Sequence, residues 1–219
     1  MGRPALAIGG IVLIGAGVAV AVGWWWPQHA DAQTQVVQRV QSVRLDTQSG
    51  DVRISARDVT STSVHERFRY SGSRPGQTYR MDGGQLVLTD CGANCSVDYE
   101  IVVPRGTTVS GNATSGDIEL QGVSADVSST SGQIDVNDAT GPVKAHSTSG
   151  DISVRLAGPQ DVSAEATSGD VDLRVPDNHY RVDARTTSGD RNIEIATDPA
   201  GPYVLDLQAT SGDITVRRS

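Results

Sequence analysis

One short motif recurs along this chain and limits what it can fold into. Ser-Gly followed by Asp or Gln appears seven times, and in the last six copies the preceding residue is Thr. From Gly116 onward the central glycines lie 16 to 23 residues apart, so insertions vary while the motif stays constant. The copies are centred on Gly50, Gly116, Gly132, Gly150, Gly169, Gly189 and Gly212. Self-similarity of this kind indicates a repeat architecture.

The residues around each glycine alternate between apolar and polar. Apolar residues stand seven and five positions before it, a small residue stands three before it, and aliphatic residues stand two and four after it. A period of two on both sides predicts two strands per repeat, each with one buried face, joined at the Ser-Gly corner. Stacking like positions on like positions predicts an all-β domain, a β-solenoid of two-strand repeats. An antiparallel β-sandwich built of hairpins is the alternative.

A column of carboxylates follows the glycines. It consists of Asp51, Asp117, Asp151, Asp170, Asp190 and Asp213, and Gln133 takes the place of Asp once. In a solenoid these side chains would be about 4.8 Å apart, where two unit charges in water repel by roughly 0.9 kcal/mol. A solvated column therefore needs no counter-ion. We interpret the motif as a structural corner, with a weak calcium site as the alternative and no other cofactor or metal expected.

One position breaks the pattern. Arg191 stands two residues after Gly189, where the other repeats have Val or Ile. We expect a two-residue bulge that lifts Arg191 and Asn192 out of the strand, with a functional arginine as the alternative.

Residues 55–104 differ from the repeats. The segments 64–70 and 96–104 alternate like strands, and Asp82-Gly83-Gly84 is typical of a hairpin turn. Four arginines, Arg67, Arg69, Arg74 and Arg80, are expected on a solvated strand face rather than at an anion site. Cys91 and Cys95 are predicted to form a disulfide, because the chain is expected to be exported. His65 is the nearest further metal ligand and has no partner at suitable spacing.

The N-terminal segment predicts a membrane anchor. No charged residue occurs between Pro4 and Gln28, and Arg3 precedes the apolar run. We therefore expect a cytoplasmic stub at residues 1–4, a transmembrane helix at 5–26, a linker at 27–39 and an extracytoplasmic β-repeat domain at 40–219. This arrangement describes a single-pass protein of the cell membrane with its C-terminal domain outside. Cleavage at Ala30-Asp31-Ala32 is the alternative, and it would give a secreted protein.

Charge and motifs narrow the function. A net charge of −8 makes nucleic acid an unsuitable partner, since binding phosphate needs a basic surface. No nucleophile elbow, phosphate-binding loop or zinc-protease motif is present, and the four histidines are well separated. Asp135 and Asp138 could meet as a carboxylate pair for sugar cleavage. We expect a non-enzymatic protein and assign no catalytic residue.

The stretch DYEIVVPRGTTV, followed by serial TSGD-I/V repeats, resembles a bacterial family of adhesin-like proteins with β-strand repeats, a domain of unknown function. The resemblance covers roughly residues 40–219. It implies a surface-exposed binding module of the cell envelope, whose ligand would be an envelope or cell-surface component. Some relatives are linked to envelope stress, so a sensor of stress or antimicrobial peptides that acts through a membrane partner is the alternative. A polysaccharide-active enzyme on a β-helix is a third hypothesis.

Overall fold

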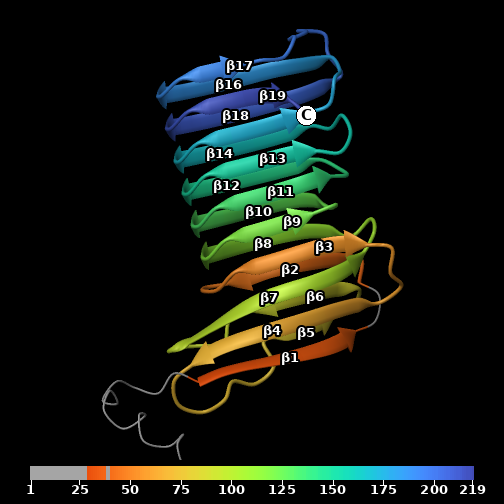
Figure 1. Cartoon of the computed structure of the whole chain (residues 1–219), viewed down its shortest axis with the longest axis vertical. Helices are drawn as coiled ribbons and strands as arrows, with labels where there is room; N and C mark the ends of the chain where they lie inside the picture. Colours follow the sequence, from red (N-terminus) through yellow and green to blue (C-terminus); the bar gives the residue numbers. More distant parts are fainter. Residues whose placement is uncertain (1–28, 38–39) are drawn as a thin grey trace, which may run out of the picture.

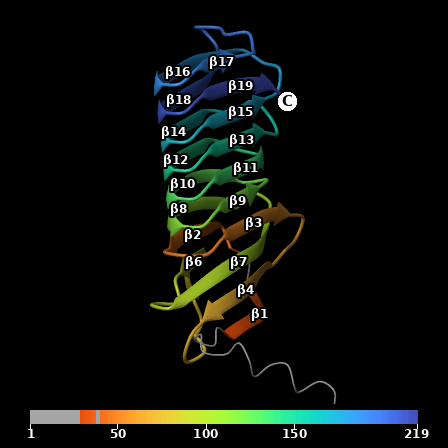
Figure 2. The same cartoon turned by 60° about the vertical axis from the view of Figure 1, so that its left-hand side comes forward.

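Two sheets face each other along the whole length of the molecule (Figures 1 and 2). The computed structural model describes residues 29–37 and 40–219. Sheet A has the order β1 (His29–Val37), β4 (Thr62–Tyr70), β7 (Cys95–Pro104), β3 (Val52–Arg57), β9 (Ile118–Gln121), β11 (Ile134–Ala139), β13 (Ile152–Leu156), β15 (Val171–Val175), β19 (Ile214–Arg218), β17 (Arg191–Ile193). Sheet B has the order β16 (Tyr180–Ser188), β18 (Tyr203–Ser211), β14 (Val162–Ser168), β12 (Val143–Ser149), β10 (Ser124–Ser131), β8 (Thr108–Ser115), β2 (Ser42–Thr47), β6 (Gln85–Thr89), β5 (Tyr79–Asp82).

The repeats stack in parallel with like positions in register. Val143 of β12 pairs with Ala125 on one side and Val162 on the other, which are its counterparts in the neighbouring repeats. Ile152 of β13 lies between Ile134 and Val171 in the same way. We call the two strands that flank one corner a rung. This all-β, solenoid-like stack of two-strand rungs matches the predicted architecture, and the antiparallel sandwich does not describe the repeats.

The predicted columns form the core. Side chains seven and five positions before the glycine point inward from sheet B, and those two and four after it point inward from sheet A. Val43, Val143, Ile134, Ile152 and Leu173 are at most 1% exposed. Full burial of one such side chain contributes roughly 1.5–3 kcal/mol. Because each rung repeats the same pattern, burial of aliphatic columns holds successive rungs together.

The order of rungs in space differs from their order in sequence at both ends of the stack. Strands β18 and β19 lie between the preceding rung, β14–β15, and the earlier repeat, β16–β17, which is thereby outermost (Figures 1 and 2). Likewise β2 and β3, the first repeat, lie between β6–β7 and β8–β9. Similar columns allow this exchange, because each repeat presents the same pattern of inward positions to its neighbours.

The pair β6–β7 is an eighth rung that the motif does not mark. Leu86 and Leu88 are in register with Val43 and Leu45, while Tyr99 and Ile101 are in register with Val52 and Ile54. This rung was not predicted from the sequence, because a longer loop, residues 90–94, replaces the Ser-Gly corner.

The N-terminal end of the stack is antiparallel. Strand β4 pairs antiparallel with β7 and with β1, and β5 pairs antiparallel with β6. Most of the predicted linker, residues 27–39, forms strand β1. Its inward positions begin with Asp31 and Gln33, so no apolar alternation reveals this strand in the sequence. The alternative cleavage site, Ala30-Asp31-Ala32, also lies within β1.

The predicted anchor at residues 5–26 lies outside the described residues. Within residues 29–37 and 40–219, no helix has the length and apolar character needed to cross a membrane.

The bulge predicted at Arg191 is wrong. Arg191 pairs in register with Ile214, and Asn192 pairs with Thr215, so no extra residue enters β17. The position is tolerated because this rung is the outermost one, where an inward side chain meets no further rung. The Arg191 guanidinium instead turns across the end of the core and donates to the Ala184 carbonyl at 2.9 Å.

Candidate functional site

The Ser-Gly corner requires glycine for two physical reasons. Gly150 has a φ of +146°, a conformation that residues with a side chain rarely adopt. A Cβ atom at Gly150 would also lie 2.3 Å from the carbonyl oxygen of Gly132 on the neighbouring rung. The same close approach occurs at every other repeated corner glycine. The glycine column therefore lets successive corners stack closely.

The aspartate column bonds one rung to the next. The Oδ1 atom of Asp151 accepts the backbone N–H of Asp170 at 2.8 Å, and Oδ1 of Asp170 accepts the N–H of Asp213 at 2.7 Å. The column continues with Asp213 accepting from Asp190, Asp51 from Asp117, and Asp117 from Gln133. A carboxylate bonded to a backbone N–H makes a charge-assisted hydrogen bond, which is stronger than a neutral one. These bonds support the interpretation of the motif as a structural corner.

The eighth rung, β6–β7, which we call the hidden rung, joins this column through Asp98. Its Oδ1 accepts the N–H of Asp51 at 3.2 Å and also pairs with Arg69 at 2.8 Å. Asp98 could have been found from the alternation of SVDYEIVVP, in which Asp98 precedes the inward Tyr99.

The geometry does not favour calcium at the corner. One oxygen of each bonded Asp is directed at a backbone N–H, and the Gln133 side chain donates to Asp135 at 3.0 Å. Among the described residues, no cluster of three or more His, Cys, Asp or Glu side chains could hold a metal ion. The column can serve as a hydrogen-bonding spine without a cation.

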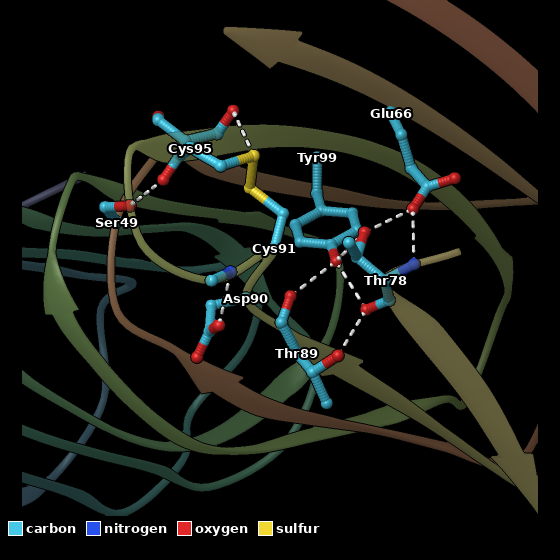
Figure 3. Close-up of a disulfide and its surroundings, with 10 residues drawn as sticks. Ser49, Glu66, Thr78, Thr89, Asp90, Cys91, Cys95 and Tyr99 are labelled. Atoms are coloured by element: carbon cyan, nitrogen blue, oxygen red, sulfur yellow. Dashed lines mark hydrogen bonds between the residues drawn. A yellow bond between two sulfur atoms is a disulfide. The ribbon is translucent and has the colours of Figure 1, made fainter. Parts of the chain in front are cut away.

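A disulfide lies at the corner of the hidden rung (Figure 3). Cys91 and Cys95 are bonded, with their Cα atoms 5.6 Å apart. The Ser49 hydroxyl of the first repeated corner donates to the Cys95 carbonyl at 3.3 Å. The disulfide therefore closes the loop that takes the place of a Ser-Gly corner. His65 is occupied elsewhere, where Nδ1 contacts the Thr34 hydroxyl at 2.6 Å.

Beside the disulfide, a buried polar network crosses the N-terminal core (Figure 3). The Tyr99 hydroxyl lies 2.6 Å from both the carbonyl and the hydroxyl oxygen of Thr78, and 2.7 Å from the Thr89 carbonyl. The Thr78 hydroxyl donates to Glu66, whose other carboxylate oxygen accepts from Gln33 at 2.7 Å. Glu66 is fully buried. Burial, with the nearby Glu66 charge, raises the pKa of Tyr99 well above its usual value.

The four arginines near this network do not form one site. Arg69 pairs with Asp98 and Arg74 with Asp31, while Arg67 and Arg80 are exposed on β4 and β5, which belong to different sheets. Their exposure agrees with the expectation of a solvated face.

A shallow trough lies on the outer face of sheet B. It has a volume of about 460 Å³ and crosses β2, β8, β10, β12 and β14. A second depression of about 290 Å³ shares Ser110, Asp126 and Lys144 with the first and extends it toward Thr108 and Ser124. The floor carries short side chains from β8 and β10, and the walls carry Arg44 of β2 and Lys144 of β12. We call this surface the sheet B trough.

The trough holds charges that the fold leaves unused. Within the described part of the chain, Arg44, Asp126 and Lys144 form no ion pair or side-chain hydrogen bond, whereas His146 lies 3.5 Å from Glu165. The trough was not predicted from the sequence. A signal was present at Gly111, the one glycine in an otherwise apolar inward column.

The candidates for catalysis have separate structural partners. Asp135 bonds Gln133, and burial raises the pKa of Asp135. Asp138 lies 3.8 Å from Arg155. His179, which precedes β16, pairs with Asp198 of the loop before β18 at 3.3 Å. The structure therefore gives each of these residues a different neighbour.

Comparisons with known proteins agree with this architecture. A candidate cell adhesion protein from Clostridium sporogenes superposes with a TM-score of 0.56 at 13% identity, over 87% of this chain and 100% of that chain. A candidate adhesin from Bacteroides fragilis gives a TM-score of 0.45 at 12% identity, over 87% and 97% of the two chains. The first likeness shows a shared fold. No curated protein matches the chain. The Toastrack DUF4097 family profile matches residues 41–217. The chain therefore belongs to the Toastrack DUF4097 family.

Proposed function

We propose that this protein is a membrane-anchored, non-enzymatic binding module that displays its β-repeat stack outside the cell and attaches to an envelope or cell-surface component. The observation that carries the proposal is a contrast within the stack. The corner carboxylates and the buried Glu66 are occupied by bonds within the fold, whereas the sheet B trough presents unpaired charges to solvent. Such a surface is suited to binding a large ligand from one side.

Two further observations support display outside the cell. The disulfide between Cys91 and Cys95 is a feature of proteins in oxidising compartments. The apolar run before Trp24 has the length of a membrane span and follows Arg3, which favours a cytoplasmic N-terminus. A solved structure of similar fold is a candidate cell adhesion protein, and this agrees with a binding role.

The test uses the full chain reconstituted in liposomes and mixed with isolated cell-envelope material. Retention of the liposomes and release of soluble sugar are measured together over a range of protein densities, and protein-free liposomes serve as the control. We expect saturable retention without sugar release. Sugar release in proportion to protein would establish an enzyme instead, and absence of retention would contradict attachment to the envelope.

A second arm tests display. Cells that produce the full chain with Ser219→Cys are treated with a membrane-impermeant thiol reagent. Labelling of intact cells at the level of lysed cells is the expected result. Labelling only after lysis would contradict export of the stack.

A further inference from the structure

We propose that the sheet B trough binds a carboxylate-bearing polysaccharide, which crosses β8 and β10 on its way from β2 to β12, with its carboxylates held by Arg44 and Lys144. This inference rests on the binding role proposed above and names the ligand class and the site.

The shape of the trough fits a linear ligand. The two depressions share Ser110, Asp126 and Lys144, so they form one continuous surface. Across the strands this surface extends from Arg44 of β2 to Glu165 of β14, four strand steps, which is about 19 Å at the spacing of strands in a sheet. A short stretch of an extended chain fits this length, and the open side lets the polymer continue beyond both ends.

The floor of the trough fits a ligand covered with hydroxyl groups. Ser110, Asn112 and Ser128 offer hydroxyl and amide groups from adjacent strands. The residues that line the trough include no Phe, Tyr or Trp side chain, so the site lacks the apolar pocket that commonly anchors a peptide side chain. Gly111 keeps β8 close to β2, because a Cβ atom there would lie 2.1 Å from the Leu45 carbonyl oxygen.

The charges of the walls fit carboxylates that are spaced along the ligand. Arg44 and Lys144 occupy the same column on strands three steps apart, so their Cα atoms are about 14 Å apart. Each can make a charge-assisted hydrogen bond to a carboxylate. Asp126 lies between them and can accept hydrogen bonds from two ligand hydroxyls.

The test measures binding of a galacturonate trimer to the full chain in detergent by calorimetry. Arg44→Gln and Lys144→Gln each remove one wall charge, and we expect each to weaken binding about tenfold. The matched control is Arg181→Gln, an exposed arginine of sheet B outside the residues of the trough, which should change affinity less than about twofold. Ser128→Tyr fills the floor without a change of charge and should abolish binding. The methyl-esterified trimer should bind at least tenfold more weakly than the acid.

The outcomes separate this inference from the proposed function. Trimer binding that survives Arg44→Gln, Lys144→Gln and Ser128→Tyr would place the site elsewhere. Retention on envelope material without trimer binding would overturn the ligand class and leave the proposed function intact. Equal or tighter binding of triglutamate would identify an acidic peptide as the better ligand and overturn the polysaccharide. Loss of both retention and trimer binding in the unmodified protein would reject both proposals.

Discussion

The two ends of the stack are closed in different ways. The N-terminal end adds antiparallel strands, a disulfide and large side chains that include Phe68 and Tyr99, and it buries the polar network around Glu66. The C-terminal end has the Tyr180–Tyr203 ring contact, the Arg191 side chain and a loop whose Asp198 N–H donates to the Tyr180 carbonyl. A parallel stack can therefore be ended either by a change of strand direction or by a few side chains on a regular rung.

The corners also differ between the N-terminal end of the stack and its middle. In the regular rungs the corner must be glycine, because the neighbouring carbonyl leaves no room for a Cβ atom. On the hidden rung Val97 takes the place of the corner glycine, just before Asp98. A Cβ atom at Gly50 of the next rung would lie 2.1 Å from the Val97 carbonyl oxygen. A corner must therefore be glycine only where another rung packs against it on the side that faces the hidden rung.

The largest effect should follow replacement of a glycine inside the stack. Gly150→Ala combines a φ of +146° with a Cβ atom 2.3 Å from the Gly132 carbonyl oxygen. We expect the free energy of unfolding to fall by about 4 kcal/mol, measured by denaturant titration. Gly158→Ala is the control, since a Cβ atom there meets nothing within 4 Å, and it should change stability by less than about 0.5 kcal/mol. Equal effects of the two variants would contradict the packing argument.

Removal of a buried tyrosine hydroxyl should destabilise the protein more at the N-terminal end of the stack than at the C-terminal end. Tyr99→Phe removes the buried hydroxyl that bonds the Thr89 carbonyl and the Thr78 hydroxyl, while the Thr78 carbonyl keeps its bonds from the N–H and the hydroxyl of Thr89. We expect a loss of about 2 kcal/mol. Tyr180→Phe removes a single bond of 3.1 Å to the Pro176 carbonyl and should cost about 0.5–1 kcal/mol. Both values come from thermal and denaturant unfolding. A larger loss for Tyr180→Phe would reverse the ranking of the ends.

The same tyrosines predict a loss of stability at alkaline pH. Burial raises the pKa of Tyr180 to about 12 and also raises that of Tyr99, from a usual value of 10.0. Above pH 10.0 the unfolded tyrosines release protons that the folded ones retain, so alkali favours unfolding. The stabilisation is complete below pH 10.0 and is lost as the pH rises through the folded values. Urea titrations across this range should show the decline, and it should be weaker in the Tyr99→Phe, Tyr180→Phe double variant.

The smallest effect on stability, with a change of assembly, should come from Arg191. Arg191→Ile continues the aliphatic column to the outermost rung, so the free energy of unfolding should change by less than about 1 kcal/mol. Loss of the inward charge should expose an apolar end and favour end-to-end association, because inward-pointing charges protect strand edges. Sedimentation velocity measures the association. If the variant associates no more than the unmodified protein, the loop that carries Asp198 protects this end without Arg191.

Much of the regular stack could be predicted from sequence, because each rung repeats the same inward columns. The pairing of Val143 with Val162 follows directly from the alignment on glycine. The order of rungs could not be predicted, since near-identical columns make β16 and β18 interchangeable on β14. Arg191 was misinterpreted because the alignment shows the column and does not show which rung is outermost. At the N-terminal end, β1 escaped because Asp31 and Gln33 are polar, and they are bonded to Arg74 and Glu66.

The exchanged order of β16–β17 and β18–β19 also governs the sequence of folding events. On the ribosome, residues 180–193 emerge before residues 203–218, yet they pair along their length only with the later strands. Between these two moments, β14 and β15 present an open edge that either repeat could occupy, in the same register. The last repeat must therefore enter beside β14 and β15 while the earlier one is kept out or displaced. A nascent chain that stops within this interval contains all residues of β16 and β17 but lacks β18 and β19, the strands with which they pair in the native stack.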